Sequence, residues 1–168
     1  STLHLWWARR PLAACRAVLF ASIVDDPSSL EPEQWVERDE ESERQRLFSI
    51  IEALVKWESS TNEEILHLAR TEIARSVART HSVELSKRLT PSQVADALRE
   101  YAPPVLDPFC GGGSIPLEAQ RLGLEAHGSD LNPVAVLITK ALIEIPPIFA
   151  GQPPVSEGSG MRDGGIRG

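Results

Sequence analysis

Apolar residues recur at helical spacing through roughly the first hundred positions of the chain. Pro11 is a favoured first helical residue, and Thr61 with Glu64 forms a capping-box signature. Thr90 with Gln93 gives the same kind of start signal, with Pro91 between them as the first helical residue. These signals predict helices over about 11–24, 33–57, 61–80 and 90–101. Residues 1–101 are therefore expected to form a helical N-terminal region.

The pattern changes after the Ala-Pro-Pro segment at 102–104. Short apolar runs beginning at Val105 and at Glu125 predict two strands, each followed by a segment with helical spacing. The helices are expected over 114–122, with Gly123 as C-terminal cap, and from Asn132 to about Glu144. Strand, helix, strand, helix in this order is typical of the opening of a doubly wound α/β fold.

The fold class that we predict is α/β: a helical region followed by the first β-α-β-α portion of a Rossmann-like fold. Two strands are too few for such a sheet, so the fold is expected to be incomplete. The predicted organisation is 1–101 helical, 102–150 the start of a cofactor-binding domain, and 151–168 a disordered tail. That tail holds six of the 11 glycines.

Charge and cysteine content narrow the function. The 168 residues contain 24 acidic and 17 basic side chains, a net charge of -7, which argues against this chain being the main electrostatic grip on a nucleic acid. Cys15 and Cys110 lie far apart with no Cys/His cluster, so no disulfide and no metal site is predicted, and a cytoplasmic protein is expected. The apolar run 12–24 is too short to span a membrane and contains Arg16.

The most informative residues surround a glycine turn. Asp107 ends the first strand, Gly111 to Gly113 allow a sharp turn, and a helix N-terminus near Ser114 offers unpaired amides to a ligand. Asp130 follows the second strand 19 residues after Gly111, the spacing expected of a carboxylate that binds ribose hydroxyls. The simpler interpretation is a flexible turn, with the acid capping the next helix.

The decapeptide Val-Leu-Asp-Pro-Phe-Cys-Gly-Gly-Gly-Ser at 105–114 resembles the cofactor motif of S-adenosylmethionine-dependent amino-group methyltransferases. With Trp-Trp-Ala-Arg-Arg-Pro-Leu at 6–12, residues 1–155 are similar to the N-terminal region, of unknown function, of putative adenine-specific DNA methylases. This resemblance implies that Asp107, Phe109, the glycine turn and Ser114 hold the methionine portion. Asp130 would hold the ribose, and Leu131 or its neighbour Asn132 would border the adenine.

An N-terminal segment also bears on the cofactor. In related amino-methyltransferases a His-x-x-x-Lys-Pro-x-x-Leu segment folds against the methionine end of the cofactor. His4 and Arg9-Arg10-Pro11-Leu12 resemble a looser version of it, with arginine in place of lysine. A capped helix with two surface arginines explains the same residues equally well.

The chain departs from the family at the catalytic loop. Adenine methyltransferases bind the flipped base with an Asp/Asn-Pro-Pro-Tyr/Phe loop, whereas the Pro-Pro pairs at 146–147 and 153–154 have neither Asp or Asn before them nor an aromatic residue after them. The two Pro-Pro pairs are interpreted as linkers, so no catalytic residue is assigned.

Cys110 is interpreted as a packing residue of the glycine turn rather than a nucleophile. The missing loop and the DNA contacts are expected in further parts of the methylase, and this chain alone is expected to be inactive.

Two other interpretations stay open. The same Asp-Pro-Phe-Cys-Gly, with Ile-Pro-Leu-Glu-Ala at 115–119, resembles RNA guanine-N2 methyltransferases, although no RNA-binding module precedes it. A non-catalytic remnant or interaction module that retains half of a cofactor fold is the third. The missing Pro-Pro-aromatic loop favours this last interpretation for the chain itself.

Overall fold

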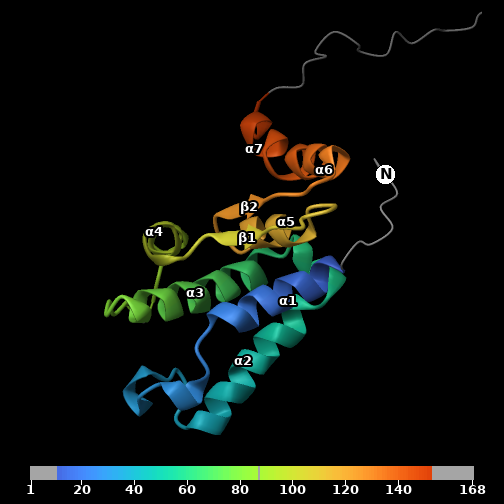
Figure 1. Ribbon diagram of the computed structural model, residues 1–168. Coiled ribbons are helices and arrows are strands. Elements are labelled where there is room, and N and C mark those ends of the chain that lie inside the picture. Colours follow the sequence, from blue (N-terminus) through green and yellow to red (C-terminus); the bar gives the residue numbers. More distant parts are fainter. Residues whose placement is uncertain (1–10, 87, 153–168) are drawn as a thin grey trace, which may run out of the picture.

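The computed structural model describes residues 11–86 and 88–152 (Figure 1). Helices dominate the described chain, with short 3-10 turns between them and one small sheet near the C-terminal end. The elements are α1 (Leu12–Ile23), η1 (Pro27–Ser29), η2 (Pro32–Gln34), α2 (Glu40–Leu54), η3 (Trp57–Ser60), α3 (Glu63–Thr80), α4 (Pro91–Tyr101), β1 (Val105–Asp107), α5 (Ser114–Arg121), β2 (Ala126–Gly128), α6 (Pro133–Ile143) and α7 (Ile145–Phe149). His4, Arg9, Arg10 and most of the predicted tail lie outside the described residues.

The four N-terminal helices are present, but two of them begin differently from the prediction. Helix α4 has the predicted capping box, in which Thr90 and Gln93 exchange hydrogen bonds. Helix α3 is capped by Asn62, which accepts from the amides of Glu64 and Ile65, so the predicted Thr61 box was wrong.

Helix α2 is shorter than the predicted 33–57. It begins at Glu40 because Asp39 adopts an extended conformation and accepts from the amide of Ser42. The preceding turn η2 has its own capping box between Glu31 and Gln34, which ends before the helix starts. Two separate caps therefore divide the segment 33–57, which the sequence pattern predicted to be one continuous helix.

One hydrophobic cluster joins the helical region to the strand-containing half. It includes residues of α1, α2, α3, α4 and α5, and Val105 and Ala126 of the two strands pack against its edge. Its buried members include Phe20, Leu54, Ala69, Ile73, Leu98 and Leu122. The small sheet thus packs against the helical region.

The sheet is parallel, with Val105 opposite Ala126 and Asp107 opposite Gly128. Helix α5 connects the two strands and packs on both. Gly123 ends this crossover in the left-handed conformation, as predicted, with φ of +77°. The structure therefore confirms a mixed α/β chain, mostly helical, with a two-stranded parallel sheet.

The Pro-Pro pair at 146–147 was wrongly interpreted as a linker. Both prolines lie in the first turn of the short helix α7, where a missing amide hydrogen costs nothing. Within the described ranges, none of the helices combines the length and the apolar character needed to cross a membrane.

Candidate functional site

The two strands end at the same edge of the sheet and carry the candidate site there. The ladder continues past the strands, because the amide of Ser129 donates to the carbonyl of Asp107 over 2.9 Å. The amide of Cys110 then donates to the carbonyl of Ser129 over 3.0 Å. These two bonds place the glycine turn directly beside the segment that holds Asp130, as the spacing predicted.

Asp107 is a loop-forming residue in this structure. Its side chain is buried, and Oδ1 accepts from the amide of Phe109 at 3.1 Å. This is an Asx turn, in which the carboxylate replaces a backbone acceptor and lets the chain reverse direction. Asp107 thus shapes the turn that begins the predicted site.

Asp130 closes the glycine turn from the other strand. Its Oδ2 accepts from the amide of Gly111 at 2.9 Å, and its Oδ1 accepts from the amide of Asn132 at 2.8 Å. The amide hydrogen bonds from Asn132 and Gly111 hold the pKa of the Asp130 carboxyl below its usual range. The group is therefore ionised at neutral pH, and each oxygen retains capacity for one more donor.

Thr139 of α6 supports the turn from behind and was missed by the sequence analysis. Its hydroxyl donates to the carbonyl of Gly111 at 3.2 Å and lies 3.4 Å from Sγ of Cys110. The space beside it requires glycine, because a Cβ on Gly113 would lie 3.0 Å from the Thr139 Oγ1. The only available signal was a single hydroxyl in the helix Pro133–Ile143, whose other residues are apolar except for Lys140.

The residues predicted to contact a ligand directly differ in their exposure. Ser114 begins α5 and is buried, whereas Phe109 is 77% exposed and Leu131 is 97% exposed. Phe109 follows β1 and Leu131 follows β2, so the two residues lie in the segments that leave different strands. Because both side chains are exposed in the folded chain, an apolar part of a ligand could pack against them without any change in the fold.

Cys110 is buried beneath the turn and touches the second strand closely. A Cβ placed on Gly128 would lie 3.1 Å from the Cys110 Cβ, which explains why β2 ends in glycine. This position agrees with the interpretation of Cys110 as a packing residue.

Helix α5 is attached to α1 by a buried ion pair. Arg16 and Glu118 are 1% and 0% exposed, and Nε of Arg16 lies 2.6 Å from Oε2 of Glu118. Arg16 also donates to the carbonyl of Leu54, and Arg121 pairs with the second oxygen of Glu118. The helix whose N-terminus faces the glycine turn is thereby held to the helical region by Arg16.

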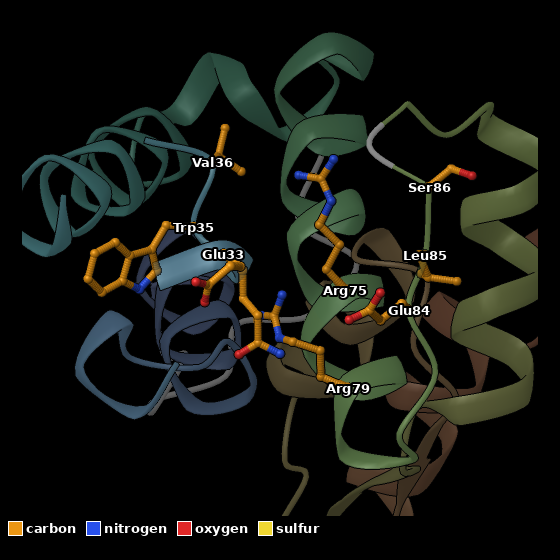
Figure 2. A pocket seen from close by; sticks show the side chains of 9 residues that line it. Glu33, Trp35, Val36, Arg75, Arg79, Glu84, Leu85 and Ser86 are labelled. Carbon is orange, nitrogen blue, oxygen red and sulfur yellow. The ribbon is translucent and has the colours of Figure 1, made fainter. Parts of the chain in front are cut away.

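A cavity of about 530 Å³ lies away from the glycine turn, between the segment 33–36, helix α3 and residues 84–86 (Figure 2). Arg75 and Arg79 line it, but both are ion-paired, Arg75 with Glu72 and Arg79 with Asp25. The pairing leaves no net positive charge to attract an anion. Among the residues that the structure describes, no group of His, Cys, Asp and Glu side chains could hold a metal ion.

Comparisons with known proteins reach only the first part of the chain. A family model described as a protein of unknown function, DUF1156, matches residues 1–50. No curated protein and no solved structure is similar enough to count as a match. The first 50 residues thus support a domain of unknown function, in a part of the chain that contains Arg16 but not the glycine turn.

Proposed function

We propose that the chain is the S-adenosylmethionine-binding N-terminal portion of a DNA methyltransferase that methylates an exocyclic amino group, most simply that of adenine. The observation that carries this proposal is the position of the Asp130 carboxylate, which bonds to Gly111 within the turn that leads into α5. A ribose-binding carboxylate and a glycine turn are thereby joined at the carboxyl edge of a parallel sheet.

The residues present are compatible with this cofactor. Each Asp130 oxygen accepts a hydrogen bond from a backbone amide, and its remaining acceptor position is available to one of the two hydroxyls of a ribose. The exposed side chains of Phe109 and Leu131 offer apolar surfaces for the methionine and adenine parts. Asp107 contributes indirectly, since its carboxylate already holds the amide of Phe109 and is buried.

The cofactor, when bound, supplies an electrophilic methyl group on a sulfonium ion. The protein's part in such a transfer is to orient the cofactor and to keep it still, which requires a turn that does not rearrange. Thr139 serves this purpose by anchoring the carbonyl of Gly111, and the left-handed Gly113 serves it by starting α5.

DNA is proposed as the substrate of the whole methylase rather than of this chain. The net charge of -7 and the absence of a Pro-Pro-aromatic sequence both argue that other parts of the methylase bind the DNA base. An RNA guanine-N2 methyltransferase remains the alternative enzyme. A purely binding role is the second candidate function, favoured by the exposed apolar surface around α6.

Calorimetric titration with S-adenosylmethionine tests the proposal. Asp130→Ala is expected to weaken binding roughly ten- to a hundredfold, the loss of one or two charged hydrogen bonds. Asp96→Ala is the matched control, because Asp96 is an exposed carboxylate on α4 whose partner is Arg99. Equal affinity of wild type and Asp130→Ala would eliminate the ribose assignment.

A second measurement tests the claim that the catalytic loop is missing. Wild-type chain incubated with radiolabelled S-adenosylmethionine is expected to transfer no methyl group to DNA or to transfer RNA. Incorporation into either nucleic acid would refute that claim, and the labelled polymer would distinguish the two enzyme classes.

A further inference from the structure

Two kinds of contact join α1 to α5, which lie against each other (Figure 1). The first is apolar, since Phe20 of α1 and Ala119 of α5 belong to the same hydrophobic cluster. Apolar packing has no preferred direction, so it brings the helices together without fixing one exact alignment. The second is the ion pair between Arg16 and Glu118, whose geometry is directional. The pair therefore sets where α5 lies on α1.

A buried ion pair is a weak source of stability, which makes its presence here informative. Removing both charges from water costs about as much as their attraction returns, and apolar residues of similar volume are often at least as stable. Arg16 is held in place from a second side, because it donates to the carbonyl of Leu54 at the end of α2 over 3.1 Å. What this arrangement supplies is one defined position for the Glu118 side chain.

A fixed Glu118 also fixes the start of α5, because about one turn of helix separates them. Glu118 is the fifth of the eight residues of α5, about 6 Å along the axis from the first. The amide of Leu117 donates to the carbonyl of Gly113 over 3.0 Å, and the amide of Gly111 donates to the carboxylate of Asp130. A short backbone path thus leads from the ion pair to the proposed ribose-binding group.

We propose that Arg16 is a positioning residue of the cofactor site, which acts by pairing with Glu118 and so orients α5 and the glycine turn. The segment 1–50, whose family match carries no known function, thereby acquires a role: its helix α1 holds the glycine turn in the geometry that binds. The effect on cofactor affinity rests on the proposed function. The effect on the orientation of α5 does not.

The first measurement uses the free chain and compares two arginine variants. Arg16→Met removes the α1 partner of Glu118, whereas the control Arg46→Met breaks an ion pair between α2 and α3, that of Arg46 with Glu72. Amide residual dipolar couplings report the orientation of α5 relative to α3. In Arg16→Met the couplings of α5 and of the glycine turn are expected to depart from the wild-type geometry, and in Arg46→Met they are expected to fit it. The proposal is overturned if they fit in Arg16→Met, or if they depart equally in both variants.

The second measurement separates positioning from stability. Calorimetric titration with S-adenosylmethionine is done at a temperature at which circular dichroism shows each variant to be folded. Arg16→Met is expected to bind about tenfold more weakly than wild type, and Arg46→Met is expected to bind equally well. The double variant Arg16→Met/Glu118→Met has no unpaired buried charge, yet its affinity is expected to stay about tenfold lower, because an apolar pair does not fix α5. Wild-type affinity in the double variant would overturn the proposal.

A milder variant keeps the test decisive if Arg16→Met does not fold. Arg16→Lys keeps a charge beside Glu118, but a single ammonium group does not reproduce the fork that also reaches the carbonyl of Leu54. Its α5 couplings are expected to depart from the wild-type geometry by less, and unchanged couplings would then overturn the proposal. If wild type binds no cofactor, the proposed function fails, and the dipolar couplings alone decide the positioning role.

Discussion

The buried pair between Arg16 and Glu118 yields the most quantitative prediction of stability. Removing one member of a buried ion pair leaves an uncompensated charge, which typically costs about 3–5 kcal/mol. The two members are not equivalent here. Glu118→Met leaves the 1% exposed guanidinium of Arg16 with only the carbonyl of Leu54, whereas Arg16→Met leaves Glu118 paired with Arg121.

The free energy of unfolding is therefore expected to fall by about 3–5 kcal/mol in Glu118→Met and by a smaller amount, about 1–3 kcal/mol, in Arg16→Met. The double variant is expected to be more stable than Glu118→Met, because no buried charge is left unpaired. Urea unfolding followed by far-UV circular dichroism measures all three values. An Arg16→Met variant less stable than Glu118→Met, or three additive values, would refute the reasoning.

Two further predictions concern backbone strain and acid. Both Gly113 and Gly151 have positive φ, so replacement of either by alanine is expected to cost roughly 1–2 kcal/mol of stability through backbone strain. Gly113→Ala is expected to cost more than Gly151→Ala, because only a Cβ at Gly113 would crowd Thr139. Equal decreases in the melting temperature of the two variants would contradict this. Burial raises the pKa of Glu43, but hydrogen bonds from Arg46 and backbone amides outweigh it and lower the pKa from 4.5. The contribution of the ionised Glu43 to the free energy of unfolding is therefore complete above pH 4.5 and is lost as the pH falls through the lowered pKa. Glu43→Gln is expected to make the free energy of unfolding less dependent on pH in this range.

Local signals predicted much of the fold because they act within a few residues. The Thr90 capping box and the left-handed Gly123 need only their own turn, and both were predicted correctly. The start of α2 was not, because Glu31 and Asp39 compete to cap neighbouring turns and the sequence does not rank them.

The candidate site was predictable where strand and turn spacing decide proximity. Nineteen residues from Gly111 to Asp130 span one helix and one strand, which returns the carboxylate to the turn. The bond of the Asp130 carboxylate to the amide of Gly111 was not predicted, although the simpler interpretation had this acid bonding to amides of the next helix. The contact of Thr139 with Gly111 and the pairing of Arg16 with Glu118, 102 residues apart, could not be predicted, because contacts between distant segments leave no periodic pattern in the sequence.

The central claim is that S-adenosylmethionine binds at the glycine turn. An amide-resolved NMR titration of the chain with this cofactor tests it most directly, because it reports where binding occurs as well as whether it occurs. We expect chemical-shift changes concentrated at Phe109, Gly111 and Leu131, and all three amides should follow one dissociation constant. Shifts centred on the cavity beside Trp35 and Arg79, or none at saturating cofactor, would contradict it.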